Sequence, residues 1–236
     1  MKLNDPELVR RQYETEAGLE VRRAAQTRYR KGPDGFDTAF AAVSEADPRR
    51  VLEVGCGMGQ FSDRLARDTA AEVVATDLSP RMVELASARG LDARLADVQA
   101  LPFEDGEFDC AVANAMLYHV TDLERALWEL RRVLEPGGRF VATTIGAEHM
   151  KDLWLLVGYH VPERQFSRES GEEALSRHFA RVERRDVDAE LVFPDAEAFR
   201  AYVDSTLFAA AVPRPLPDVE GTFTSRTRVT VFVAER

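Results

Sequence analysis

Three glycines and one carboxylate near residue 55 have the spacing that a nucleotide-like ligand requires. Gly55, Gly57 and Gly59 follow the apolar run at residues 51–54. Glycine lets the backbone approach a ligand closely, and the first turn of a following helix offers unpaired N–H groups. Glu53 lies near the carboxyl end of the predicted strand, where open α/β sheets bind their ligands. A carboxylate there suits a cationic or hydroxyl-bearing ligand better than a pyrophosphate.

The glycine spacing distinguishes between the common nucleotide-binding turns. Gln60 follows the third glycine, so the pattern is not the Gly-x-Gly-x-x-Gly dinucleotide motif, and no Gly-Lys-Ser or Gly-Lys-Thr of a P-loop is present. Residues 53–59, EVGCGMG, resemble motif I of class I S-adenosylmethionine-dependent methyltransferases. The resemblance implies that S-adenosyl-L-methionine is the cofactor, with S-adenosyl-L-homocysteine as product. It also implies five cofactor contacts from this segment, namely Glu53, Gly55, Cys56, Gly57 and Gly59.

A second carboxylate, Asp77, ends a predicted strand at residues 71–76, about twenty residues beyond the glycines. Nucleotide-binding βαβ units place the acid that holds the ribose hydroxyls here, because a carboxylate accepts from both hydroxyls. The alternative is a helix cap, since Ser79-Pro80 begins the next helix. Because the glycines precede it, we favour the ribose role. We assign two further cofactor contacts beside it, Leu78 and Met82.

A third strand, predicted at residues 91–96, leads into the stretch 97–103, DVQALPF. In the methyltransferase family this stretch lines the adenine pocket. The resemblance implies that the Asp97 side chain accepts from the adenine amine and that Val98 supplies a backbone N–H. An exocyclic amine needs an acceptor and a ring nitrogen needs a donor, so the assignment is chemically consistent. An ordinary polar loop is the alternative.

The segment NAMLYHV follows a predicted buried strand at residues 108–113. By the same resemblance, Asn114 contacts the methionine part of the cofactor, while Tyr118 and His119 face the methyl-transfer cleft. Methyl transfer is a displacement at a sulfonium methyl, so the protein mainly aligns the nucleophile and excludes water. His119 is the candidate base if the acceptor loses a proton, and a hydrogen-bonded structural histidine is the alternative. Tyr13 either closes over the cofactor or packs beside it.

The elements that must position these residues alternate as in a doubly wound α/β sheet. Further strands are predicted at residues 139–144, 182–191 and 222–234, and further helices at 61–66, 81–88, 123–134, 171–179 and 195–211. We therefore expect a mostly parallel seven-stranded sheet with one antiparallel strand, spanning residues 49–236. Residues 1–48 are expected to form an amino-terminal helical cap, with helices at 4–13, 19–29 and 36–43.

An insertion after the fifth strand, residues 146–168, departs from the family pattern. Insertions here commonly form a substrate lid in this family, which makes Trp154, Tyr159 and His160 candidate pocket residues. An apolar stripe of this kind also serves simple packing. Earlier in the chain, residues 22–31 are locally basic, and we favour a solvated helix face over a cap that steers an acidic substrate.

The amino-acid composition limits the kinds of binding partner that we expect. The chain has 236 residues, 45% of them hydrophobic and 31% charged, with a formal net charge of −10. Such an acidic balance opposes binding to an extended phosphate backbone, so we expect no nucleic-acid partner. The two cysteines are expected to be reduced, and residues 1–11 show no signal core, which favours a cytoplasmic location without membrane contact. The His and Cys spacing predicts no metal site.

We therefore expect a monomeric or homodimeric methyltransferase that acts on an N or O atom of a small metabolite. One alternative is an RNA or protein methyltransferase, which the basic segment could serve and which a salt-dependent affinity for RNA would indicate. The other is a non-catalytic cofactor-binding subunit, because intact binding residues do not prove catalysis.

Overall fold

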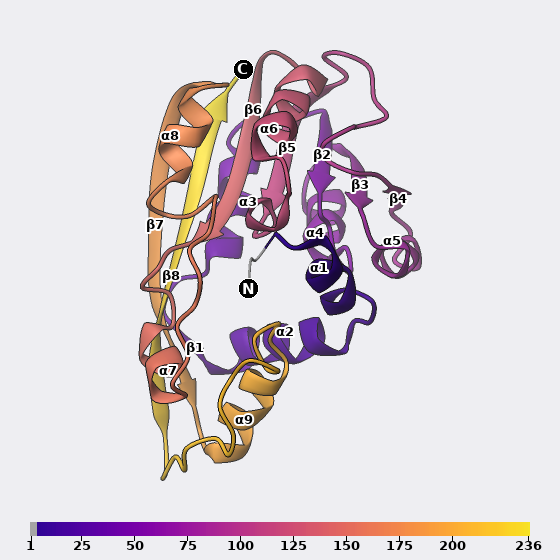
Figure 1. The fold of residues 1–236 in the computed structure, drawn as a ribbon. Coiled ribbons are helices and arrows are strands. Elements are labelled where there is room, and N and C mark those ends of the chain that lie inside the picture. Colours follow the sequence, from indigo (N-terminus) through magenta and orange to yellow (C-terminus); the bar gives the residue numbers. More distant parts are fainter. Residues whose placement is uncertain (1–3) are drawn as a thin grey trace.

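The computed structural model describes residues 4–236 as one eight-stranded sheet with helices on both faces (Figure 1). The strands are β1 (Arg30–Lys31), β2 (Arg50–Val54), β3 (Glu72–Asp77), β4 (Asp92–Leu95), β5 (Phe108–Asn114), β6 (Leu134–Ile145), β7 (Ala180–Phe193) and β8 (Phe223–Glu235). The helices are α1 (Pro6–Gln12), α2 (Ala17–Tyr29), α3 (Gly35–Ser44), α4 (Gln60–Asp68), α5 (Pro80–Ser87), η1 (Leu117–His119), α6 (Leu123–Val133), α7 (Lys151–Leu156), α8 (Gly171–Ser176) and α9 (Ala196–Asp204).

The strand order is β1-β7-β8-β6-β5-β2-β3-β4. Strands β2 to β6 pair in parallel, and β8 lies antiparallel between β6 and β7. This confirms the predicted mostly parallel sheet with an antiparallel strand. The expected count of seven was one too low, because β1 adds an edge strand that pairs antiparallel with β7. Two residues are too few for an alternating apolar pattern, so the sequence shows no sign of this strand.

Strand β2 has a nearly unbroken apolar run, whose side chains point alternately to the two faces, because both faces of the parallel sheet are covered. Val51 belongs to the cluster under α3 and α4, together with Ala39, Phe61 and Leu65. Leu52 belongs to the cluster on the opposite face, which includes Leu127 and Leu130 of α6 and Leu175 of α8. The sheet is therefore doubly wound, as predicted. The helix α3 was expected in the cap, but Ala39, Ala42 and Val43 pack on the sheet itself.

A third apolar cluster lies where β7 and β8 extend beyond the other strands. It joins Leu191 and Phe193 of β7 to residues of α7 and α9, among them Trp154 and Phe199. Figure 1 shows α2, α7 and α9 gathered at this lower end, on the side to which the arrowheads of β2 and β5 point. The carboxyl edge of the parallel strands therefore faces these helices.

Three predicted elements differ from the structure by more than two residues at one end. The helix expected at residues 195–211 ends at Asp204, and the apolar residues Leu207 and Phe208 join the third cluster from turns instead. The helix expected at 171–179 ends at Ser176, and Phe179, just beyond it, stacks on Phe140 with ring centroids 5.2 Å apart. Strand β6 begins at Leu134, five residues before the expected start.

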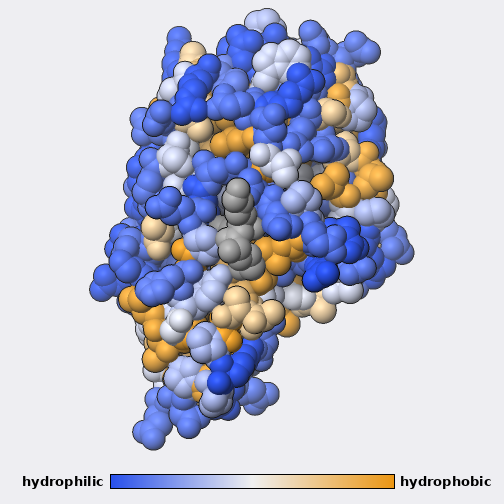
Figure 2. All heavy atoms as spheres, viewed as in Figure 1, coloured by the Kyte–Doolittle hydropathy of each residue, from blue (hydrophilic) through white to orange (hydrophobic). Residues whose placement is uncertain are grey.

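Figure 2 shows a mostly hydrophilic face, with apolar side chains gathered at its lower left, where Figure 1 places α7. Leu155 and Leu156 of α7 are exposed. Within residues 4–236, the helices are too short or too polar to cross a membrane.

Candidate functional site

The strand register brings the predicted acidic and amide residues to one edge of the sheet. Glu53 of β2 pairs with Ala75 of β3 on one side and Val112 of β5 on the other. Asp77 and Asn114 are the last residues of β3 and β5, so they flank the glycine turn that follows β2. Parallel strands end together, and this carboxyl edge is where doubly wound sheets bind ligands.

Glu53 is a buried carboxyl group, only 1% exposed. The Ser62 hydroxyl donates to its Oε2, and Asn114 Nδ2 donates to its Oε1 at 3.2 Å. Burial raises the pKa of Glu53 to about 7, while these two hydrogen bonds and the nearby Arg23 guanidinium oppose the rise. Ser62 lies on α4, nine residues after Glu53, and no spacing rule in the sequence pointed to it.

We expect the pH dependence of stability to report this burial. Between pH 4.5 and about 7 the unfolded chain loses the Glu53 proton before the folded protein does, so rising pH destabilises the fold by on the order of 3 kcal/mol. Glu53→Gln removes this titration. Thermal unfolding without cofactor should therefore show the Tm of Glu53→Gln rising relative to wild type from pH 5 to pH 8. A constant difference between the two proteins would contradict the burial argument.

The Asp77 carboxylate holds the glycine turn. Its Oδ2 accepts from the Gly57 backbone N–H and its Oδ1 from the Ser79 N–H, both at 2.9 Å. Burial raises the pKa of Asp77 above its ordinary value, and these backbone hydrogen bonds oppose the rise. The cap of α5 is Ser79, whose Oγ accepts from Met82 N–H at 3.4 Å. The residue that caps α5 is therefore Ser79 and not Asp77, as the helix-cap alternative had it.

Gly59 begins α4 with a left-handed backbone, φ +77°, which favours glycine. A Cβ atom there would lie 2.8 Å from Leu91 Cδ1 and 2.9 Å from Ala86 Cβ. The third glycine of the motif therefore lets α4 approach α5 closely.

Gly59→Ala should destabilise the protein by about 2 to 4 kcal/mol, through backbone strain and overpacking together. Gly90→Ala is the matched control, because Gly90 also has a positive φ of +85° but no atom lies within 4 Å of its Cβ position. We expect the free energy of unfolding of the control, measured by urea unfolding, to fall by only about 1 kcal/mol. Equal losses in the two variants would show that the close approach of α4 contributes nothing.

The other predicted cofactor residues differ in exposure. Leu78 is 63% exposed directly after Asp77, whereas Met82 is fully buried on α5. Cys56 packs with Ala75 and Ala86, so only its backbone remains for a ligand. Burial raises the pKa of the Cys56 thiol well above its ordinary value, which keeps it protonated.

Asp97 and Val98 lie in the loop after β4. Both Asp97 oxygens accept from Gln99 Nε2 at 3.0 Å, and Oδ1 also accepts from Gln99 N–H at 2.9 Å. Gln99 in turn accepts from the Thr121 hydroxyl at 2.7 Å, which ties this loop to the segment after β5. Val98 is buried in the sheet core, so its side chain fixes the loop and its backbone is the part that remains for recognition.

Tyr13, Tyr118 and His119 form an aromatic corner beside these groups. Tyr13 Oη lies 3.2 Å from His119 Nε2, and the two rings meet edge to face at 5.7 Å. The Tyr118 and His119 rings have centroids 4.5 Å apart. Burial raises the pKa of both tyrosines, so their hydroxyls are neutral at physiological pH. The predicted site residues of η1 and of the amino-terminal helices are thus brought together.

The amino-terminal helices are fixed to α5 beside the glycine turn. Ser79 Oγ donates to the Tyr13 carbonyl oxygen at 2.9 Å, and Arg81 forms an ion pair with Glu16 at 2.7 Å. Leu19 of α2 lies over the turn, 3.4 Å from the position that a Cβ on Gly57 would take.

Arg23 of α2 is half-buried and lies near Glu53, which differs from the favoured prediction of a solvated basic face at residues 22–31. Burial lowers the pKa of its guanidinium, and the nearby Glu53 carboxylate opposes the fall. Within residues 4–236 it has neither a carboxylate partner nor a hydrogen bond, only a contact with the Phe36 ring at 5.2 Å. Arg23 is half-buried whereas Arg28 is exposed, and nothing in the sequence distinguishes these two arginines.

The residues predicted on the lid have other neighbours. Trp154 is buried, and its ring packs edge to face on Phe208 at 5.1 Å. Tyr159 contacts both of these rings, while His160 is exposed. These contacts give Trp154 and Tyr159 a packing role in the third cluster, and their role as substrate contacts stays a prediction.

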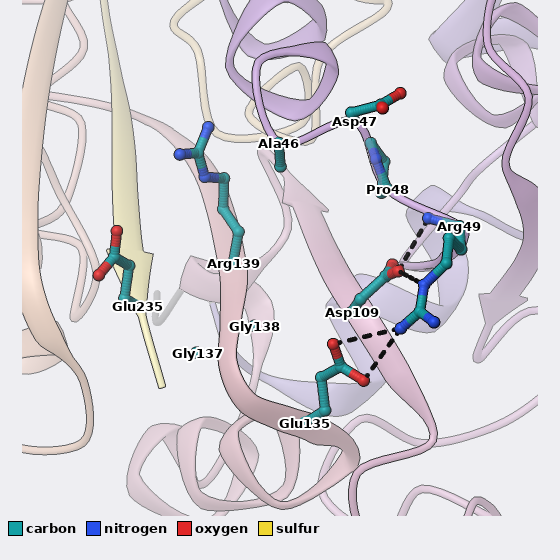
Figure 3. A pocket seen from close by; sticks show the side chains of 10 residues that line it. All are labelled: Ala46, Asp47, Pro48, Arg49, Asp109, Glu135, Gly137, Gly138, Arg139 and Glu235. Atoms are coloured by element: carbon teal, nitrogen blue, oxygen red, sulfur yellow. Dashed lines mark hydrogen bonds and ion pairs between the residues drawn. The ribbon is translucent and has the colours of Figure 1, made fainter.

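A separate cavity of about 470 Å³ opens at the opposite, amino edge of the strands (Figure 3). Its lining residues are Ala46, Asp47, Pro48, Arg49, Asp109, Glu135, Gly137, Gly138, Arg139 and Glu235. Figure 3 shows Arg49 turned toward Asp109 and Glu135, which it contacts at 3.1 and 3.3 Å. Arg139 is paired with Glu45 at 3.7 Å. The cations of this cavity already have carboxylate partners, and none of the predicted site residues lines it.

The carboxyl edge fits S-adenosyl-L-methionine group by group. Asn114 Oδ1 is a buried acceptor without a partner in the described chain, and it suits an ammonium donor beside Glu53. The Asp77 carboxylate suits a ribose, and the exposed Leu78 suits the face of an adenine ring. In the same part of the chain, His, Cys, Asp and Glu residues form no cluster of three that could hold a metal ion.

A doubly wound sheet with a glycine turn after its first parallel strand and an acid after the next defines the Rossmann-like nucleotide-binding class. Comparison with known proteins identifies the family. A family model described as a methyltransferase domain matches residues 52–142. The malonyl-(acyl-carrier protein) O-methyltransferase of Pseudescherichia vulneris is 39% identical over 119 residues, which are 50% of this chain and 47% of that protein.

The enzyme of the same name from Geobacter sulfurreducens is 31% identical over 209 residues, 75% of this chain and 78% of that protein. The chain thus spans about half the length of the first relative and over three quarters of the second. A solved SAM-dependent methyltransferase from Thermotoga maritima, described as a possible histamine N-methyltransferase, has the same fold with a TM-score of 0.62 and 19% identity, covering 96% of this chain and 99% of that one. The chain belongs to the class I S-adenosylmethionine-dependent methyltransferases, and the predicted family, enzyme class and cofactor are confirmed.

Proposed function

We propose that this enzyme transfers the methyl group of S-adenosyl-L-methionine to an N or O atom of a small metabolite. The observation that carries this proposal is the aromatic corner, where Tyr13 from the amino-terminal helices lies 3.2 Å from His119 at the carboxyl end of β5. A helical segment fixed by Ser79 and Arg81 covers this corner, so the acceptor must fit beneath it. The names of the relatives include both an O- and a possible N-methyltransferase, so both atom types are retained.

We assign the cofactor-binding roles by charge and hydrogen-bonding capacity. Glu53 and Asn114 Oδ1 accept from the ammonium of the methionine part, and the Arg23 guanidinium binds its carboxylate. Asp77 accepts from the ribose hydroxyls and Leu78 packs on the adenine ring. The Asp97 side chain accepts from the adenine amine, and the Val98 backbone N–H donates to a ring nitrogen of adenine.

The sulfonium supplies the chemical activation, so the chain needs to hold, orient and protect the acceptor. The His119 imidazole accepts the proton that the nucleophilic N or O atom loses, and Tyr13 Oη keeps the ring in place through its contact with Nε2 at 3.2 Å. Tyr13 and Tyr118 exclude water from the line of attack. We propose that α1 and α2 act as the cap over this site.

Transfer of a labelled methyl group from S-adenosyl-L-methionine into a fractionated cell extract tests this proposal. We expect label in the small-molecule fraction, which then provides material for identifying the acceptor. A parallel reaction with Asp77→Ala should give much less label, because this variant binds the cofactor more weakly, and the comparison separates the enzyme's activity from that of the extract. Label in the RNA or protein fraction would contradict the proposed acceptor class, and cofactor binding without turnover on any acceptor would favour the non-catalytic alternative.

A further inference from the structure

Within residues 4–236, Arg164 is a cation that forms no ion pair, and it lies beside the aromatic corner. Its Nε atom is buried and has no hydrogen-bond partner, and within residues 4–236 its side chain forms neither an ion pair nor a hydrogen bond. Most arginines in this acidic chain are paired with carboxylates; the neighbouring Arg168, for example, contacts Asp186 and Asp188 at 2.9 and 2.5 Å. Burying an unpaired charged group is costly, and a bound ligand can offset that cost.

The position of Arg164 relates it to the reaction. Its guanidinium carbon lies 5.7 Å from the centroid of the Tyr118 ring. The next residue, Gln165, donates from Nε2 to the Val120 carbonyl oxygen and so fixes this segment against η1. The Tyr118 ring in turn lies 4.5 Å from the His119 ring. Arg164 and His119 are therefore both neighbours of one aromatic ring.

The charged and titratable groups around Arg164 include one carboxylate, Glu169, which opposes the fall in the Arg164 pKa that burial causes but forms no ion pair with the guanidinium. Burial and the Arg164 charge lower the pKa of His149 to about 4, so this histidine is neutral, and its Nδ1 accepts from the Arg228 N–H at 3.0 Å. Glu169 is exposed and accepts from the Ala147 N–H at 3.2 Å. Arg22, which donates to the Ser205 carbonyl oxygen, adds a second positive charge near Tyr118.

We propose that Arg164 binds a carboxylate of the methyl acceptor, so that the substrate is a small carboxylic acid whose N or O nucleophile lies at His119. This inference rests on the proposed function and specifies its substrate class. The planar guanidinium offers two parallel N–H donors, which match the two oxygens of a carboxylate. The carboxylate is anchored rather than methylated, and the acceptor spans the Tyr118 ring between anchor and nucleophile. Arg164 is thus a specificity-determining residue.

Binding of simple acids to the protein saturated with S-adenosyl-L-homocysteine tests the proposal. Acetate, butyrate and benzoate are compared with their uncharged amides by ligand-observed NMR titration, with inorganic phosphate as a further probe. We expect at least one acid to bind wild type at least tenfold more tightly than its amide. In Arg164→Gln the ratio of the amide Kd to the acid Kd should fall to near one. Arg131→Gln removes an exposed arginine of α6 that forms no ion pair within residues 4–236, and it should keep the preference.

Three outcomes would overturn the assignment. They are an acid preference that survives in Arg164→Gln, no acid preference in wild type, and phosphate binding more tightly than every acid. Arg164→Gln should keep wild-type affinity for S-adenosyl-L-homocysteine in calorimetry and should not lower the Tm, since it removes a half-buried charge whose Nε atom has no hydrogen-bond partner within residues 4–236. Failure of wild type to bind S-adenosyl-L-homocysteine would count against the proposed function alone. The acid and amide titrations would then be run on the free protein.

Discussion

Asp77→Ala should bind S-adenosyl-L-methionine roughly ten- to a hundredfold more weakly than wild type, on the scale of lost charge-assisted hydrogen bonds. The carboxylate has two expected roles, since it accepts from the ribose hydroxyls and already holds the Gly57 and Ser79 N–H groups at 2.9 Å. Its loss removes a ligand contact and releases the glycine turn. Isothermal titration calorimetry measures the change directly.

Asp92→Ala is the matched control for this prediction. Asp92 begins the neighbouring strand β4, at the end of the sheet opposite to Asp77, and pairs with Arg94 at 2.6 Å on the surface. Removing it should leave the affinity unchanged, because exposed ion pairs contribute little. An unchanged affinity in Asp77→Ala would rule out the ribose assignment.

His119→Ala should lower kcat by about a hundredfold or more, with little change in cofactor affinity, if His119 accepts the proton of the nucleophile. Tyr13→Phe is the companion variant, because it removes only the hydroxyl that contacts His119 Nε2 at 3.2 Å. We expect a much smaller loss of kcat in Tyr13→Phe. Both are measured with the acceptor that the labelling experiment identifies.

The alternative for His119 is a structural role at the corner between β5 and α6. It makes the opposite prediction, namely that kcat holds in His119→Ala while the Tm drops. Comparing kcat and Tm in the same variant therefore separates the two roles.

The parts of the site that depend on local spacing could be predicted from the sequence. The alternate glycines require a strand, a turn and a helix, and Asp77 follows at the distance that one βα unit sets. These constraints act within one stretch of chain. The two-face packing of β2 likewise follows from its nearly unbroken apolar run.

The rest depends on contacts between distant segments, which no local pattern reveals. Arg23 and Arg164 are ordinary basic residues in the sequence, and only the fold shows that both are half-buried and that neither forms an ion pair within residues 4–236. The sequence also gives no sign that Ser62 has a role, because only the fold of α4 brings its hydroxyl to Glu53. The apolar stripe around Trp154 is equally compatible with a lid and with packing, and its contact with Phe208 across 54 residues is what indicates packing.

Hydrogen exchange with and without S-adenosyl-L-homocysteine is the most direct test of where the cofactor binds. We predict slower exchange at residues 53–60, 77–82, 97–99 and 114–119, which surround the carboxyl edge, and in the amino-terminal helices that cover it. Protection confined to residues 46–49 and 135–139, around the cavity of Figure 3, would contradict the assignment of the cofactor to the carboxyl edge.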